Sequence, residues 1–198
     1  MDRNKEKLDA KADVLKEACL ALLGDGQLQA GPIIKDRYPF VPLSTQSRRW
    51  TPQQSVGVFI KDGFLDRYSG ARLIFPGALL LLSHLSPEEF PYHPHWKMSK
   101  THPAYWELYP TIDHIVPIAR GGQDHPSNCV CTSMLHNAAK ANWTLEELGW
   151  ELHEPGDMRD WDGLSSVFLA LIEKQAEALT VSAIRNWYYA LKKLRGKA

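Results

Sequence analysis

The chain has 198 residues, 44% of them hydrophobic and 23% charged, which suits one or two compact domains with a core of ordinary size. Its 23 basic and 23 acidic side chains cancel, so the chain as a whole lacks the positive field of a histone-like nucleic-acid binder. Three cysteines without a C-x-x-C pair exclude a disulfide framework and a four-cysteine zinc site, and no apolar stretch is long enough for a bilayer. We therefore expect a soluble cytoplasmic protein with no membrane partner.

Residues 1–50 are expected to form an N-terminal segment that consists of an amphipathic helix and an irregular connector. Apolar side chains recur at helical spacing over residues 4–23, and glycines follow directly, which predicts an amphipathic helix with a C-terminal stop. Residues 27–50 contain three prolines and little periodicity. They are predicted to be an irregular connector that ends in the basic aromatic cluster Arg48-Arg49-Trp50.

A central domain is predicted over residues 51–150. The sequence Thr51-Pro52-Gln53-Gln54 combines a cap residue, a proline at the first helical position and a glutamine three residues after the cap, which predicts a helix to about Lys61. A hairpin with its turn at Gly70 and a helix over 76–85 should follow.

Residues 86–110 are rich in proline and histidine and are predicted to be a long loop with one short helical turn. The histidines in this loop have no acidic partner at ligand spacing, so we interpret them as loop residues rather than a second metal site. They are His93, His95 and His102.

The next segment has the pattern strand, loop, strand, helix. Strands are predicted over 111–118 and 128–132 on either side of a Gly121-Gly122 turn, and a helix over 133–141. A C-terminal helical extension, residues 151–198, should contain helices near 163–178 and 181–195. Its last 21 residues carry five basic groups and no acid, which indicates either a phosphate-binding arm or a solvated helix face.

The strand–loop–strand–helix segment resembles the HNH endonuclease family. The family's pattern consists of D-H-x-x-P, a G-G turn, an Asn about fourteen residues after the His, and a closing N-x-x-K on the helix. The matching residues are Asp113, His114, Pro117, Gly121, Gly122, Asn128, Asn137 and Lys140. The resemblance covers about residues 64–141 and implies an α+β fold, in which a ββα-metal (His-Me finger) unit is embedded among flanking helices.

The resemblance also implies an activity, the divalent-metal-dependent hydrolysis of DNA phosphodiester bonds. That reaction needs a nucleophile made from water and a cation that neutralises the phosphate oxygens. His114 is the expected base that activates water, because imidazole is partly neutral at physiological pH. Asp113 and Asn137 would hold one Mg²⁺ or Mn²⁺ through oxygen atoms, and Asn128 would orient the histidine. His136 is the alternative last ligand, and it would suit Zn²⁺ or Ni²⁺ better.

The chain departs from many relatives in one respect. Where they carry two C-x-x-C pairs around a structural zinc, this chain has Asp66-Arg67-Tyr68-Ser69 and Ser133-Met134-Leu135-His136. No structural zinc is expected, and packing of the surrounding helices should hold the unit together. Of the two cysteines at 129 and 131, one is predicted to be buried and one exposed.

The predicted partner is DNA, and the basic residues expected to contact it are Arg67, Arg120, Lys140, Lys192, Lys193 and Arg195. For Arg67 an ion pair with Asp66 or Asp62 is an equal alternative, and Lys140 is equally well a solvated helix residue. A monomer would nick one strand, whereas a homodimer or a partner protein would allow double-strand breaks. The rival interpretations are a catalytically inactive nucleic-acid-binding module and a helical interaction or structural protein.

Overall fold

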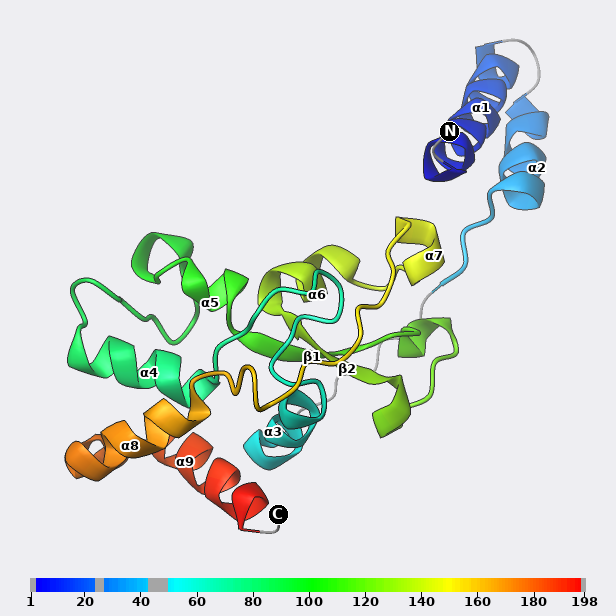
Figure 1. The fold of residues 1–198 in the computed structure, drawn as a ribbon. Coiled ribbons are helices and arrows are strands. Elements are labelled where there is room, and N and C mark those ends of the chain that lie inside the picture. The colour runs from blue at the N-terminus through cyan, green and yellow to red at the C-terminus, as the bar shows by residue number, and fades with distance from the viewer. Residues whose placement is uncertain (1–2, 24–26, 43–49, 197–198) are drawn as a thin grey trace.

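The computed structural model describes residues 3–23, 27–42 and 50–196 (Figure 1). In chain order the elements, with η for 3-10 turns, are α1 (Arg3–Leu23), α2 (Gln27–Arg37), α3 (Pro52–Lys61), α4 (Pro76–Leu85), η1 (Met98–Lys100), α5 (Ala104–Glu107), β1 (Pro110–His114), η2 (Ile118–Arg120), η3 (Pro126–Asn128), β2 (Cys129–Ser133), α6 (Met134–Lys140), α7 (Leu145–Leu148), α8 (Ser165–Lys174), η4 (Ala176–Thr180) and α9 (Ser182–Arg195). The protein is mostly helical and belongs to the α+β class, with an antiparallel hairpin packed against α6. Within the described ranges, no helix combines the length and apolar character needed to cross a bilayer.

The N-terminal helices α1 and α2 lie side by side and project from the rest of the molecule (Figure 1). The prediction of an irregular connector is wrong for residues 27–37, which form α2 with Pro32 inside it. Burial of Val14, Ala18 and Ala30 accompanies the packing of the two helices, and we attribute the tolerance of an interior proline, whose usual cost is about 3 kcal/mol, to that packing. The arginines of the predicted basic cluster, at 48 and 49, lie outside the described residues.

The helices and the hairpin turn predicted for the first part of the central domain, residues 51–85, are present in the structure. α3 begins at Pro52, and Thr51 and Gln54 exchange the hydrogen bonds of a capping box. Leu65 and Arg72 form a β-bridge on either side of the turn that contains Gly70, whose positive φ of 72° favours glycine. The predicted helix over 76–85 is α4.

The β1–β2 hairpin pairs Pro110 with Ser133 at one end and His114 with Cys129 at the other. β1 ends at His114 rather than at residue 118, because Pro117 cannot donate to a strand ladder and the chain turns into η2. Every residue of β2 is buried, since the hairpin lies between α3 and α6. The prediction that one of Cys129 and Cys131 is exposed is therefore wrong.

A hydrophobic cluster joins the central residues to the C-terminal helices. Phe59 and Phe75 pack with Phe168 of α8 and Trp187 of α9, at ring separations of 5.2 to 6.4 Å. The predicted helix over 163–178 is divided into α8 and η4, and the helix predicted over 181–195 is α9. The C-terminal segment thus contributes directly to the core around the hairpin.

The long segment 86–110 has its own aromatic packing. Trp96, Tyr105 and Tyr109 are in mutual contact, and the Tyr105 hydroxyl shares a hydrogen bond of 2.8 Å with Ser83. His102 stacks on Phe90 with ring centroids 4.3 Å apart. The segment contains two short helical turns, η1 and α5, where one was predicted, and the aromatic contacts hold the rest of it.

Candidate functional site

The hairpin separates the two residues of the Asp113-His114 pair. Side chains alternate along a strand, so Thr111 and Asp113 lie on the face toward α6. His114 and its cross-strand partner Cys129 lie on the opposite face, where the His114 ring is 6.2 Å from the ring of Trp50, just before α3. We name these the α6 face and the α3 face of the hairpin.

On the α6 face, Asp113 is the acceptor of a buried polar network. The Tyr68 hydroxyl donates to Oδ2 of Asp113 at 2.6 Å, and Nζ of Lys140 lies 2.9 Å from the same oxygen. Lys140 is fully buried and also donates to the carbonyl of His114 at 2.8 Å. Burial, with the negative charge of Asp113, holds the pKa of Tyr68 well above its usual value, so this hydroxyl stays protonated as a donor.

This placement corrects the expectations for Lys140. Its side chain is neither solvated nor at a surface that DNA could reach, because it is fully buried and paired with Asp113. A fully buried ammonium needs such a partner.

Asn137 lies on the same face and fastens α6 to β1. Its side-chain nitrogen donates to Oγ1 of Thr111 at 2.9 Å and to the carbonyl of Ile112 at 3.2 Å. The structure thus brings Asn137 and Asp113 to one face of the hairpin, as the resemblance implies, but it places Lys140 there as well.

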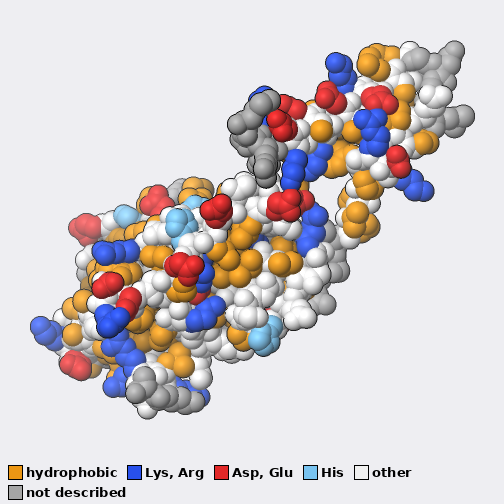
Figure 2. Space-filling view, turned by 45° about the vertical axis from the view of Figure 1, so that its right-hand side comes forward, with side chains coloured by type: hydrophobic (Ala, Val, Ile, Leu, Met, Phe, Trp, Pro, Cys, Tyr) orange, Lys and Arg blue, Asp and Glu red, His pale blue; other side chains and the backbone are white. Residues whose placement is uncertain are grey.

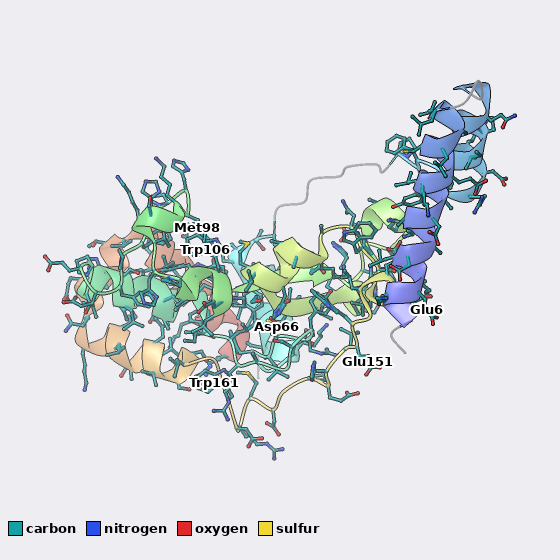
Figure 3. All side chains as sticks on the ribbon, turned by 90° about the horizontal axis from the view of Figure 1, so that it is seen from above. Glu6, Asp66, Met98, Trp106, Glu151 and Trp161 are labelled. Carbon is teal, nitrogen blue, oxygen red and sulfur yellow. The ribbon has the colours of Figure 1, made fainter. Side chains whose placement is uncertain are left out.

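His136, the alternative ligand, is bound to another carboxylate. Asp66, in the middle of the molecule in Figure 3, accepts from Nδ1 of His136 at 2.7 Å and from the Ser133 backbone N–H at 2.9 Å. Burial alone would raise the pKa of Asp66, but the hydrogen bonds from Ser133, His136 and Tyr68 outweigh it and lower the pKa. The two tetrapeptides that stand where relatives carry cysteine pairs are therefore joined by one buried carboxylate.

On the α3 face, three side chains with different donor atoms meet around the end of β1. Nε2 of His114 lies 3.1 Å from Oδ1 of Asp124, and the His114 side chain is 15% exposed. The ligand atoms of His114, Asp124 and Cys129 all lie within 4.8 Å of one another. Sequence reasoning missed Asp124, because its approach to His114 depends on the path of the loop between the glycine turn and Asn128.

Asn128 closes the loop that follows His114. Its side-chain oxygen accepts from the Val116 N–H, and its side-chain nitrogen donates to the carbonyls of Val116 and Gln123, each at 2.9 Å. The backbone N–H of Ile115 also donates to the Asn128 carbonyl at 2.8 Å. A single amide can make these bonds because it donates and accepts at once, and it thereby fixes both ends of the 115–128 loop.

Two of the arginines expected at DNA are engaged with the protein. Arg67 is largely buried, and its guanidinium donates to Oδ1 of Asp62 at 2.9 Å, which is the ion-pair alternative considered for it. Arg120 lies 3.6 Å from a Glu147 carboxylate oxygen and over the ring of Trp143. Arg67 is thus unavailable to a phosphate in this arrangement, whereas the Arg120 side chain is 35% exposed.

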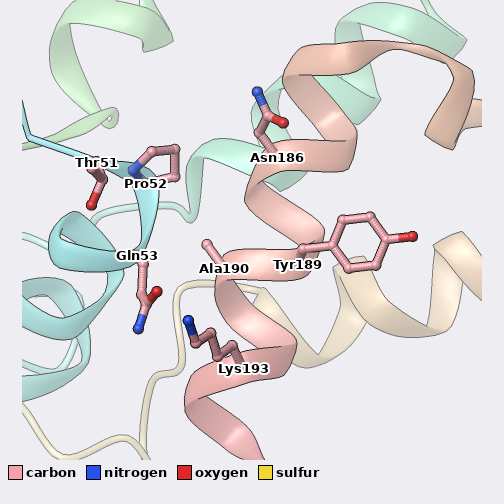
Figure 4. Close-up of a pocket in the computed structure, with 7 residues that line it drawn as sticks. All are labelled: Thr51, Pro52, Gln53, Asn186, Tyr189, Ala190 and Lys193. Atoms are coloured by element: carbon pink, nitrogen blue, oxygen red, sulfur yellow. The ribbon is translucent and has the colours of Figure 1, made fainter.

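The basic end of α9 is divided in the same way. Arg195 donates to Asp162, Ser165 and Ser166 at the start of α8, while Lys192 and Lys193 are exposed. Figure 4 shows the groove beside Lys193: Thr51, Pro52 and Gln53 lie across it from Asn186 and Ala190, and the Tyr189 ring points away from them. Trp50 directly precedes the first groove residue, Thr51, in the chain, and its ring lies 6.2 Å from the ring of His114.

No protein-family model matches the chain, and no curated protein or solved structure matches it either. The function is therefore inferred from the residues on the two faces of the hairpin and from their geometry.

Proposed function

We propose that this chain is an endonuclease of the HNH type that hydrolyses DNA phosphodiester bonds with a divalent metal ion, Mg²⁺ or Mn²⁺. The observation that carries the proposal is the position of His114. It ends β1, its imidazole reaches the surface, and Asn128 fixes the loop that follows it. A reactive group at a rigidly held strand end is typical of a catalytic position.

The proposed chemistry at His114 is the removal of a proton from the attacking water. The contact of 3.1 Å between its Nε2 and Oδ1 of Asp124 helps to hold the ring in one orientation, as a positioned general base requires. Positioned proton transfer of this kind contributes about 10² to 10⁴ in rate.

The divalent ion would supply charge neutralisation at the phosphate oxygens. Its expected oxygen ligands, Asp113 and Asn137, share the α6 face, but Tyr68 and Lys140 already occupy Oδ2 of Asp113. These residues therefore do not fit a divalent ion as they stand, because the ammonium of Lys140 has to leave Asp113 first. The requirement for a metal ion therefore has to be tested separately from the role of His114.

The surface that would meet the DNA backbone runs from α9 to the end of β1. The exposed Lys192 and Lys193 lie at one end, the groove at the start of α3 follows, and Trp50 reaches His114 at the other end. Acidic and basic side chains are interspersed over the face shown in Figure 2, so steering by net charge should be weak.

An inactive nucleic-acid-binding module is the second candidate, and the Lys140–Asp113 ion pair favours it because it neutralises the carboxylate expected to hold the metal. The interaction or assembly role is supported by the projecting α1–α2 pair and the segment that follows it: Leu20 and Leu23 of α1 and Phe40, just after α2, are exposed by 58%, 85% and 87%. A homodimer or a partner protein is thus a further proposal for this part of the chain.

A plasmid-nicking assay decides between the first two candidates. Supercoiled DNA is incubated with the full chain in Mg²⁺, Mn²⁺ or EDTA, alongside His114→Ala and the matched control His95→Ala, which removes an exposed histidine from the 86–110 segment. We expect His114→Ala to nick about 10² to 10⁴ times more slowly and His95→Ala to nick normally. Binding without nicking under all metal conditions would instead establish the inactive module.

A further inference from the structure

The meeting of His114, Asp124 and Cys129 on the α3 face has a chemistry of its own. His114 is the last residue of β1, Cys129 is the first residue of β2, and the two are direct partners in the antiparallel ladder. Asp124 reaches them from the loop between the strands. Three chain segments thus bring an imidazole nitrogen, a carboxylate oxygen and a sulfur within 4.8 Å of one another.

We propose that His114, Asp124 and Cys129 form a binding site for a borderline-soft divalent transition metal ion, of which Zn²⁺ is the type. Nitrogen, oxygen and sulfur donors together are the set that Zn²⁺ takes in proteins, whereas Mg²⁺ takes oxygen ligands. The site is therefore different in position and in chemistry from the oxygen pair Asp113 and Asn137 on the α6 face.

The spacing suits tetrahedral coordination after a small contraction. Bonds of about 2.0 to 2.3 Å to one ion place neighbouring ligand atoms roughly 3.3 to 3.8 Å apart. The His114–Asp124 pair, at 3.1 Å, is already as close as this, and no pair in the group exceeds 4.8 Å. Movements of about 1 Å, within the reach of side-chain rotation, would close the remaining gap.

Binding exchanges one proton for the ion. Sγ of Cys129 donates to the carbonyl of His125 at 3.4 Å, so its S–H bond breaks, the proton passes to solvent and the sulfur electron pair forms the metal bond. Asp124 binds as the carboxylate and His114 through the lone pair of a neutral ring nitrogen. Three protein ligands leave the fourth position to water.

The surroundings provide both rigidity and access. Asn128 fixes the loop that carries Asp124, and Lys61 donates to the Cys129 carbonyl at 2.6 Å, so both flanks of the site are held. Cys129 is fully buried, whereas the Asp124 side chain is 43% exposed. An ion would therefore enter past Asp124.

The consequence for catalysis rests on the proposed function, because both assignments use the same imidazole. A His114 that binds Zn²⁺ no longer accepts a proton from water, so micromolar Zn²⁺ should inhibit nicking in the presence of Mg²⁺.

Titration of the full chain with Co²⁺ tests the site without any reference to activity. We expect one equivalent of Co²⁺ to produce a thiolate-to-cobalt charge-transfer band that Zn²⁺ then abolishes. The band should disappear in Cys129→Ser, and Asp124→Asn, which alters an exposed loop residue, should weaken Co²⁺ affinity by about 10-fold or more.

The controls are the other two cysteines. Cys131 is equally buried two residues further along β2, and burial, with the negative charges of Asp62 and Asp66, raises the pKa of its thiol well above the usual value. Cys131→Ser and Cys19→Ser should keep the band. Its absence from the unmodified chain, its loss in either control, or an unchanged affinity in Asp124→Asn would overturn the site.

The two proposals fail in distinguishable ways. The cobalt band without nicking supports the metal site and contradicts the nuclease. Nicking without the band supports the nuclease and contradicts the metal site.

Discussion

The two faces of the β1–β2 hairpin use their ionisable groups differently. On the α6 face, Tyr68 and Lys140 both bind Oδ2 of Asp113, and the lysine is fully buried. On the α3 face, His114 and Asp124 reach the surface, and Asp124 is 43% exposed on its side chain. Asp113 and His114 are adjacent in the sequence, but Asp113 belongs to a largely buried network and His114 to one that solvent can reach.

An ionisable residue in a sequence motif can therefore have a structural role, as Asp113 does, instead of a catalytic one. A buried ion pair adds little net stability, but breaking it leaves an uncompensated charge in the interior. The His114 imidazole lies at the surface beside the exposed carboxylate of Asp124, so a change there disturbs the interior less. Variants on the α6 face should therefore change stability, and variants on the α3 face should change activity.

The largest effect is expected when the α6-face network is broken. Lys140→Ala leaves Asp113 without its cation and opens space beneath α6, so the free energy of unfolding should fall by about 3 to 5 kcal/mol. Urea denaturation followed by circular dichroism measures it. Lys192→Ala, which removes an exposed lysine, should change it by no more than about 0.5 kcal/mol. A loss below 1 kcal/mol in Lys140→Ala would show that the network is not structural.

Much of the local structure around this hairpin could be predicted from the sequence. The capping residues Thr51 and Gln54 act within four positions of each other, and the turn at Gly70 depends on one residue's backbone freedom, so both signals are local. α2 could not be predicted in this way, because its stability despite Pro32 depends on packing against α1.

The candidate site was predictable in part for the same reason. The resemblance implied that Asp113 and Asn137 approach each other and that Asn128 ties the loop to the strand, and the structure brings these side chains to those places. The resemblance could not show that Lys140 would neutralise Asp113, since Tyr68, which completes that network, lies 45 positions away. Nor could it single out Asp124, whose approach to His114 depends on the path of the loop.

A second structural carboxylate is Asp66, and its replacement by Asn should lower the free energy of unfolding by about 2 to 3 kcal/mol at neutral pH. Asp66→Asn removes the negative charge that accepts from His136 and the Ser133 backbone. Because the folded pKa of Asp66 is lowered, its contribution is fully present above the ordinary carboxyl pKa of about 3.9 and is lost as pH falls through the lower folded value. The variant should therefore lose less stability than the unmodified chain as the pH falls below about 4.

Equilibrium unfolding at several acid pH values checks this sign. Asp160→Asn, a change at an exposed carboxylate, is the control and should retain the acid dependence of the unmodified chain. An Asp66→Asn curve parallel to that of the unmodified chain would contradict the assignment.

Asn128 is expected to have a smaller effect on stability, about 1 to 2 kcal/mol, because water can reach the groups it bonds. Its effect should be on catalysis, since it holds the loop next to His114. Under the proposed function, Asn128→Ala lowers kcat with little change in KM. Asn128→Asp keeps the acceptor for Val116 but turns an oxygen toward two carbonyls, so it should not restore kcat. A change in KM alone would place Asn128 outside catalysis.

The smallest effect is expected at the DNA surface, where single charges act through solvent. Lys193→Gln removes one exposed ammonium from the groove between α3 and α9 without altering the core that α9 forms through Ile184 and Leu191. If Lys193 contacts one phosphate, the variant should bind DNA with less than about 1 kcal/mol of lost free energy and with a salt-dependence slope reduced by about 0.9. Fluorescence anisotropy over a series of salt concentrations measures both quantities. Lys97→Gln, an equivalent change in the 86–110 segment, should leave the slope unchanged, and equal slopes for the two variants would mean that the basic end of α9 is only a solvated face.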